Sequence, residues 1–199
     1  MRIIAGRHRG RSILGPASAT TRPITDRAKQ SLFDILAPRI DRAVVYDLFA
    51  GTGSMGLECL SRGAAAVTFF ERDRSALVRL RKNLATLGEQ KSAAIIDADI
   101  FRRFAEPRRA DSPAKQKTAD IIFLDPPYRY VRENTAGLQS LAHCLATDHL
   151  QPTGLLIFRH ERRDALGLPG LQPFDQRIYG SMAIDLFQPI AMPADESLA

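Results

Sequence analysis

The chain has 199 residues, of which 45% are hydrophobic and 25% charged, a composition typical of a folded globular protein and not of a disordered one. It carries 28 Lys and Arg residues against 22 Asp and Glu, which gives a formal net charge of +6. Residues 1–30 hold seven basic residues and one acidic residue, so the rest of the chain is neutral. This distribution excludes a uniformly basic coat. It predicts a neutral body with a basic N-terminal arm, a pattern typical of proteins that bind a polyanion.

Targeting and cysteine patterns favour a reducing compartment. No apolar run reaches the roughly 20 residues that a membrane-spanning helix needs, and the N-terminus lacks the apolar segment of a secretory signal. Cys59 and Cys144 lie far apart and match no metal-ligand spacing, which favours buried free thiols. We therefore expect a cytoplasmic protein that uses no metal and does not associate with a membrane.

The length predicts one main domain with a short extension. Residues 2–14 are two short apolar runs around a Gly- and Arg-rich middle, which predicts a β-hairpin, and residues 15–23 predict a loop. A helix is expected to begin near Thr25 and to stop before Pro38. The expected organisation is a basic hairpin arm, a main domain and a frayed tail, over residues 1–22, 23–189 and 190–199.

The middle of the chain alternates between apolar strands and helices. Near-continuous apolar strands of this kind predict a parallel sheet covered on both faces, which is an α/β fold. The chain then ends in an antiparallel hairpin, and the polar stretch 105–118 is expected to be a surface loop without an assigned role. The expected strands are 44–48, 66–70, 93–96, 121–124, 154–158, 176–179 and 182–187, and the expected helices are 55–62, 73–88, a short one after residue 96, and 135–145.

Parallel sheets bind ligands at the carboxyl ends of their strands, and the first strand is followed there by a glycine pattern. Gly51, Gly53 and Gly56 form G-x-G-x-x-G between a strand and a helix. Such glycines allow a tight turn that brings backbone N–H groups against a ligand. Glu71 ends the second strand, 20 residues after Gly51, and suits a ribose diol. These residues leave NAD and S-adenosylmethionine open, because both contain an adenosine ribose.

Two further features favour S-adenosylmethionine. Asp47 precedes the glycines, and its carboxylate suits a cationic amino-acid group and would repel a pyrophosphate. The fourth strand ends in Asp125-Pro126-Pro127-Tyr128, where the prolines fix an extended backbone without N–H donors. The Asp125 side chain and the Pro126 carbonyl therefore offer two acceptors for one amine. Tyr128 offers a face on which a planar base can stack.

At these residues the chain resembles the S-adenosylmethionine-dependent amino-methyltransferases, whose site reads (N/D)PP(Y/F/W). Its start (residues 2–11, R-I-I-A-G-R-H-R-G-R), the segment 22–27 and the ending 179–188 are similar to the RsmD family. That family comprises bacterial methyltransferases that act on guanine N2 of small-subunit (16S) rRNA. The resemblance runs nearly end to end. It implies a Rossmann-like, seven-stranded methyltransferase sheet with an antiparallel last strand and helices on both faces, formed by residues 23–189.

The resemblance also implies roles for individual positions. In the catalytic set, Asp125, Pro126 and Tyr128 would hold the target guanine. Asp99 would accept a hydrogen bond from the adenine amino group, although helix capping is an alternative role for Asp99 and for Thr25. The residues implied to bind the cofactor are Arg22, Thr25, Arg27, Asp47, Phe49, Gly51, Gly53, Glu71, Asp99 and Ile100. Those expected to contact RNA phosphates are Arg7, Arg9, Arg11, Arg129 and Arg132.

The expected partner is 16S rRNA, either alone or within a partly or fully assembled small subunit, and the expected state is a monomer. A DNA adenine-N6 methyltransferase is an alternative, but 199 residues leave no room for a target-recognition domain. A protein-glutamine methyltransferase usually begins the proline motif with Asn. A non-catalytic rRNA-binding assembly factor would not need Gly51, Gly53, Glu71 and Asp125 intact. An NAD oxidoreductase leaves the Asp-Pro-Pro-Tyr motif without a role.

Overall fold

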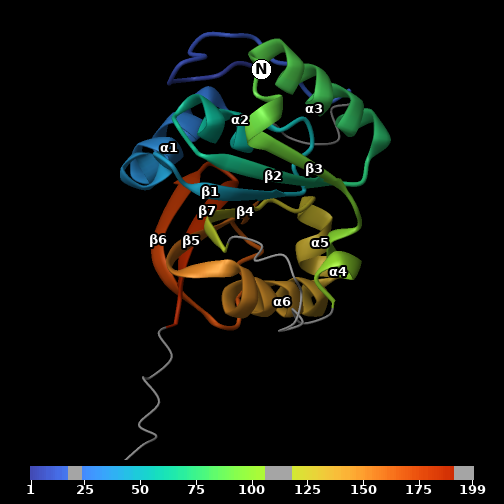
Figure 1. Cartoon of the computed structure of the whole chain (residues 1–199). Coiled ribbons are helices and arrows are strands. Elements are labelled where there is room, and N and C mark those ends of the chain that lie inside the picture. The colour runs from blue at the N-terminus through green and yellow to red at the C-terminus, as the bar shows by residue number, and fades with distance from the viewer. Residues whose placement is uncertain (18–23, 106–117, 191–199) are drawn as a thin grey trace, which may run out of the picture.

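The computed structural model describes residues 1–17, 24–105 and 118–190, in which seven strands form one sheet with the order β3-β2-β1-β4-β5-β7-β6 (Figure 1). Strands β1 to β5 run parallel, and β7 lies antiparallel between β5 and β6. The predicted Rossmann-like α/β fold with an antiparallel strand is confirmed. The strands are β1 Val44–Leu48, β2 Ala66–Glu71, β3 Ala93–Asp97, β4 Ala119–Leu124, β5 Leu150–Glu161, β6 Leu171–Tyr179 and β7 Met182–Pro189.

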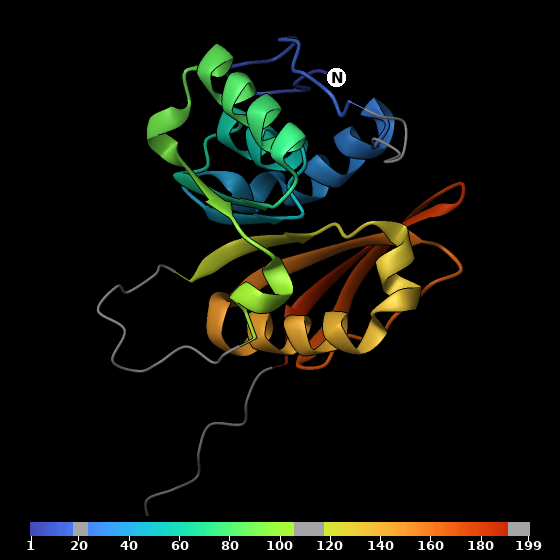
Figure 2. The same cartoon turned by 90° about the vertical axis from the view of Figure 1, so that its right-hand side faces the viewer.

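Helices cover both faces of this sheet, with α1, α2 and α3 on one side and α4, α5 and α6 on the other (Figure 2). No helix among the described residues is both long enough and apolar enough to cross a membrane. The α-helices are α1 Asp26–Ile40, α2 Ser54–Ser61, α3 Arg74–Leu87, α4 Ile100–Arg103, α5 Tyr128–Glu133 and α6 Thr135–Cys144. A 3-10 turn (Gln90–Ser92) precedes β3, and a π-helical turn (Leu145–His149) precedes β5.

The sheet separates two hydrophobic cores because successive side chains of a strand point to opposite faces. In β4, Ile121 and Phe123 pack with α1, α2 and α3, whereas Ile122 and Leu124 pack with α6. All four side chains are at most 1% exposed. The central strand β4 is therefore apolar from Ile121 to Leu124, as a sheet covered on both faces requires, whereas the edge strand β6 is mostly polar and exposed. Polar residues important for the site stand where strands end, with Glu71 as the last residue of β2 and Asp125 directly after β4.

The helix limits follow local capping chemistry. The Asp73 carboxylate accepts from the backbone N–H of Ala76 at 2.8 Å, and Gly88 ends α3 with φ +73, as predicted. The prediction that the first helix stops before Pro38 is wrong, because α1 continues to Ile40. Pro38 removes one N–H from the last turn of α1, and burial of Ile40 in the core, at 1% exposure, keeps that turn helical.

The N-terminal segment 1–17 pairs with itself and packs on α2 and α3. Arg2 and Ser12 form an antiparallel bridge, and the Ile3 N–H donates to the Arg11 carbonyl at 3.0 Å. The predicted hairpin is thus present as a tight loop with turns at its tip, and not as two extended strands. Ile3 and Ile13 are buried in the same core as α1, α2 and α3. The division into an arm and a main domain remains a prediction.

A buried ionic cluster fixes this segment to the body. Glu58 of α2 is 0% exposed and accepts from the backbone N–H groups of Ile4 and Ala5, each at 2.9 Å. The same carboxylate forms ion pairs with Lys29 and Arg62, also at 2.9 Å. Both carboxylate oxygens are therefore occupied by donors, which offsets the cost of burying a charge.

Candidate active site

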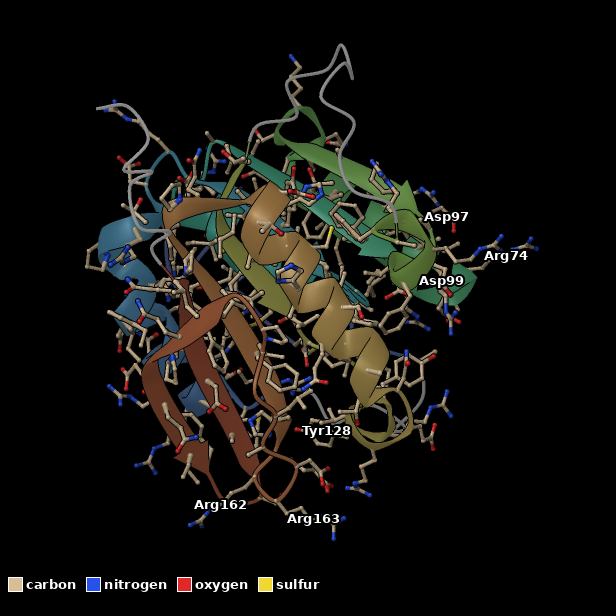
Figure 3. All side chains as sticks on the ribbon, turned by 90° about the horizontal axis from the view of Figure 1, so that it is seen from below. Arg74, Asp97, Asp99, Tyr128, Arg162 and Arg163 are labelled. Atoms are coloured by element: carbon tan, nitrogen blue, oxygen red, sulfur yellow. The ribbon has the colours of Figure 1, made fainter. Side chains whose placement is uncertain are left out.

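The polar residues predicted to act together meet at the carboxyl edge of the sheet. Leu48 of β1 pairs with Phe70 of β2 and with Leu124 of β4, so the residues that follow these strands share one edge. The glycine loop, Glu71 and Asp125 lie at these three strand ends. Figure 3 shows Tyr128 toward the same end of the molecule as the turn after β5, with Asp99 farther along the edge.

The three glycines of the glycine loop, which runs from the end of β1 into the first turn of α2, are required for different structural reasons. A side chain at Gly53 would come within 2.4 Å of Leu80, and one at Gly56 within 2.3 Å of Phe69, so both positions need glycine for packing. Gly51 has φ +55, and a side chain there would meet nothing within 4 Å. The backbone at Gly51 therefore faces open space, where a ligand can approach closely.

Asp47 lies buried beneath the glycine loop with 2% of its surface exposed. Its carboxyl accepts from the backbone N–H of Gly56 at 2.9 Å. Burial raises the pKa of Asp47 to about 8, with a smaller rise from the carboxylates of Asp125 and Glu71, while the Gly56 hydrogen bond acts in the opposite direction. A cationic group beside Asp47 would stabilise its ionised form.

Glu71 joins the end of β2 to the glycine loop. One carboxylate oxygen accepts from the Gly51 N–H at 2.7 Å, and the other accepts from the N–H groups of Arg72 and Asp73 at 2.7 and 2.8 Å. These bonds hold the carboxylate beside the open backbone of Gly51. In this orientation the carboxylate could also accept from a ribose hydroxyl. That contact of Glu71 remains a prediction.

Asp99 serves as the N-cap of α4, and its carboxylate accepts from the backbone N–H groups of Phe101 and Arg102 at 3.0 and 3.3 Å. Its second oxygen pairs with Arg72, whose other terminal nitrogen donates to the Tyr130 hydroxyl at 2.6 Å. Capping is therefore one confirmed role of Asp99. Any ligand amine that uses its second oxygen must compete with Arg72.

Phe49 and Ile100 lie next to this network, Phe49 against Tyr130 and Ile100 directly after Asp99 in the chain. Phe49 has φ +59, an unfavourable conformation for a residue with a side chain. Its ring packs edge-on against Phe101 and Tyr130, with centroids 5.9 and 6.1 Å apart, and this packing holds the conformation. Ile100 is 4% exposed and packs into the core under α4. Phe49 therefore forms an aromatic wall of the edge.

The Asp125 carboxylate forms an ion pair with Arg159 of β5, with 2.6 Å between Oδ1 and Nε. The Arg159 guanidinium also lies over the Tyr128 ring, 5.8 Å from its centre. Pro126 is buried, and Pro127 caps α5 with an extended backbone. Arg159 was not among the residues predicted from the sequence. Its signal is a charged side chain that directly follows the apolar run of β5 at the register of Asp125.

The structure also locates the predicted residues of the segment before α1. Arg22 lies outside the described residues. Thr25 is the N-cap of α1 and accepts from the Ala28 N–H at 3.3 Å, and Arg27 is exposed in the first turn. Lys29 Nζ lies 3.3 Å from Ser54 Oγ at the start of α2. The beginning of α1 is therefore held beside the glycine loop.

Comparison with known proteins agrees with this geometry. Residues 1–188 match the family model described as "Conserved hypothetical protein 95". "Ribosomal RNA small subunit methyltransferase D" of Haemophilus influenzae is 36% identical over 170 residues, which cover 85% of this chain and 83% of that protein. The Escherichia coli protein of the same name is 42% identical over 129 residues, or 65% of this chain and 61% of that protein. This chain belongs to the RsmD family.

A solved structure supports the same relationship for the fold. The protein described as "Putative methyltransferase yhhF from Escherichia coli" aligns with a TM-score of 0.79 at 33% identity. The alignment covers 96% of this chain and 99% of that chain. The fold expected of an RsmD-family methyltransferase therefore extends over the whole sheet, including the antiparallel β7.

The residues of this RsmD-family chain fit S-adenosylmethionine, the cofactor of such methyltransferases. The open backbone at Gly51 leaves space for a ligand, and the buried Asp47 carboxyl suits the cofactor's cationic amino-acid group. The Glu71 carboxylate is fixed next to that space. Among residues 1–17, 24–105 and 118–190, no group of three or more His, Cys, Asp or Glu side chains could hold a metal ion.

The predicted RNA-binding arginines of this RsmD-family chain fall into two groups. Arg7 pairs with Glu89 at 2.7 Å and Arg11 reaches the Thr86 carbonyl at 3.3 Å, both near the C-terminal end of α3. At the carboxyl edge, exposed Arg129 lies 5.4 Å from the Tyr130 ring centre, and Arg132 forms ion pairs with Glu161 and Asp164. Arg9 is exposed at the hairpin tip.

Proposed function

We propose that this protein transfers a methyl group from S-adenosylmethionine to the exocyclic N2 amine of a guanine in 16S rRNA. The observation that carries the proposal is the placement of the Asp125-Pro126-Pro127-Tyr128 turn beside the glycine loop. Asp125 is close enough to buried Asp47 to raise its pKa. An amine acceptor and a site for a cationic cofactor group thus share one edge of the sheet.

The chemistry demands alignment more than acid–base power. The cofactor supplies a methyl group already activated on a sulfonium. The lone pair of a guanine amine is delocalised into the ring, so the protein must turn it toward that methyl group. Asp125 and the Pro126 carbonyl would accept the two N–H bonds of the amine and stabilise the positive charge that develops on nitrogen. Tyr128 would support the base after it leaves its stack.

Ribosomal RNA as the substrate rests on the relatives and on charge. Two relatives are named as small-subunit rRNA methyltransferases. Exposed arginines such as Arg9, Arg129 and Arg162 suit phosphate contacts, which position RNA without reading its sequence. We also propose that the protein acts as a monomer in the cytoplasm, on rRNA alone or within an assembling small subunit.

The test is methylation of 16S rRNA from cells that lack the gene, with the modified base mapped by mass spectrometry. The wild-type protein is expected to form N2-methylguanine at a defined position. Asp125→Ala is expected to abolish transfer while S-adenosylmethionine still binds, because that side chain contacts the amine and not the cofactor. Full transfer by Asp125→Ala would contradict the site assignment. Methylation of adenine in DNA, with none in rRNA, would replace the proposed substrate.

A further inference from the structure

Arg159 is the side chain in closest register with the proposed amine acceptor. Phe158 of β5 pairs with Leu124 of β4. The next residues of the two chain segments, Arg159 and Asp125, therefore lie side by side at the carboxyl edge. Their side chains are 15% and 21% exposed, and Nε lies 2.6 Å from Oδ1. A pair that is mostly withdrawn from water is less screened than a surface ion pair and is charge-assisted. The contact is therefore strong enough to fix the carboxylate.

Two further contacts fix the arginine itself. Its guanidinium carbon lies 5.8 Å from the centre of the Tyr128 ring, within the range of a cation–π interaction. One terminal nitrogen lies 3.8 Å from the Met182 sulfur on β7. The guanidinium is thus held between the turn after β4, the start of α5 and the antiparallel strand. One side chain connects Asp125 to Tyr128, the two side chains proposed to hold the base.

We propose that Arg159 is a positioning residue for methyl transfer, which holds the Asp125 carboxylate in the orientation that accepts the target amine. The inference deepens the proposed function and rests on it. Asp125 lies near the buried carboxyl of Asp47, and the two repel each other when ionised. The positive charge of Arg159 offsets this repulsion, and the hydrogen bond from its Nε to Oδ1 restricts rotation of the Asp125 carboxylate. Without Arg159, the amine would lose its fixed acceptor and the in-line geometry with it.

The first test compares Arg159→Gln and Arg159→Lys with the wild-type protein on 16S rRNA. For Arg159→Gln, kcat is expected to fall by about 100-fold, the size typical of a misplaced reacting group. KM for rRNA and the dissociation constant of S-adenosylmethionine are expected to stay unchanged. Arg159→Lys should recover part of kcat, because it keeps the charge but not the planar fork. Arg177→Gln is the matched control, since Arg177 pairs with Asp175 at 2.7 Å on edge strand β6.

The second test asks whether Arg159 acts through Asp125. Asn keeps one carbonyl acceptor, so Asp125→Asn is expected to retain measurable transfer. Adding Arg159→Gln to Asp125→Asn should then change kcat much less than it does in the wild-type background. Additive effects in this cycle, or an unchanged kcat in Arg159→Gln, would overturn the proposal. A lower KM for rRNA in Arg159→Gln would also overturn it, because the guanidinium would then only occupy the place of the base.

Failure of this inference is distinguishable from failure of the proposed function. If the wild-type protein forms no N2-methylguanine, the proposed function fails. If the wild-type protein is active and Arg159→Gln is equally active, only the role of Arg159 fails. Unfolding temperatures of all variants are measured alongside. If Arg159→Gln unfolds early, the kcat of the charge-conserving Arg159→Lys decides. A lower kcat at unchanged KM supports the role of Arg159, and a wild-type kcat overturns it.

Discussion

The two arginine-bearing regions of the molecule differ in what their arginines contact. The hairpin arginines Arg7 and Arg11 lie near the C-terminal end of α3. At the carboxyl edge, Arg162 and Arg163 lie in the turn after β5 (Figure 3), and Arg129 and Arg132 belong to α5, which follows β4. Helix α3 follows the carboxyl end of β2, and its 14 residues span about 21 Å from there to the end that contacts the hairpin. An RNA that contacts both regions must therefore extend along the molecule. The segment that carries the net positive charge, residues 1–30, is therefore not the segment that forms the candidate active site.

The hairpin also has a structural role that the carboxyl-edge arginines lack. Its backbone satisfies the buried Glu58 carboxylate, and its Ile3 and Ile13 side chains complete a core. Removing the whole hairpin would thus change stability as well as RNA binding. Single substitutions are needed to separate the two effects.

The largest expected effect is on stability and concerns the anchor of the hairpin. Glu58→Ala leaves Lys29 buried without its counter-ion and frees the N–H groups of Ile4 and Ala5. We expect the free energy of unfolding to fall by about 3–5 kcal/mol, as for other broken buried pairs. Denaturant unfolding measures this loss. Asp41→Ala, which removes a carboxylate with 78% exposure, is the control and should be nearly neutral. Equal losses in both variants would show that the cluster has no special role.

The next largest effect concerns RNA binding at the carboxyl edge. Replacing Arg129, Arg162 and Arg163 together by Gln should weaken rRNA binding and reduce its salt dependence. The slope of log K against log salt should become shallower by about two to three, or slightly less than one per lost phosphate contact. Filter binding over a range of salt concentrations measures the slope. An unchanged slope would mean that these arginines do not touch phosphate.

A smaller effect is the pH dependence of S-adenosylmethionine binding, which tests the cofactor site independently of both arginine regions. Below pH 8 the Asp47 carboxyl holds a proton that must leave before it can face the cofactor's ammonium. Affinity for S-adenosylmethionine should therefore rise by up to about tenfold per pH unit as pH approaches about 8. Calorimetric titration across this range measures the trend. Asp47→Asn should bind more weakly with a flat profile, whereas Asp41→Asn should keep the wild-type profile.

The smallest expected effect comes from the hairpin tip. Arg9 is exposed, so Arg9→Ala should reduce the slope of log K against log salt by slightly less than one while leaving stability unchanged. The same salt titration measures the slope, with thermal unfolding as the control for folding. If Arg9→Ala reduced this slope more than the carboxyl-edge triple variant does, the hairpin and not the carboxyl edge would be the main RNA-binding region.

Much of the fold was predictable because its signals are local. The apolar strand 44–48 and the helix limits Asp73 and Gly88 follow from burial on both faces and from capping chemistry. The helix α5 was not predicted, because it is short and directly follows two prolines. Strand β5 begins at Leu150, before its apolar run, since pairing with β4 extends it beyond the pattern.

The candidate site was predictable only in part. Asp47, Glu71 and Asp125 stood at strand ends, where sequence alone assigns them to one edge. Their intramolecular partners depend on tertiary packing, which joins residues far apart in the chain. Arg159 lies 34 positions from Asp125, and Arg72 lies 27 positions from Asp99. Distinguishing Gly51 from the packing glycines also required the neighbouring side chains of Leu80 and Phe69.

The position of β7 between β5 and β6 has a consequence for synthesis on the ribosome. Strand β6 is made before β7, yet it joins the sheet only by pairing with β7. Until residues 182–189 emerge, β5 presents an unpaired edge and β6 has no place in the sheet. A message truncated before codon 182 would therefore remove two strands from the sheet, and the nascent protein would expose the β5 edge to aggregation.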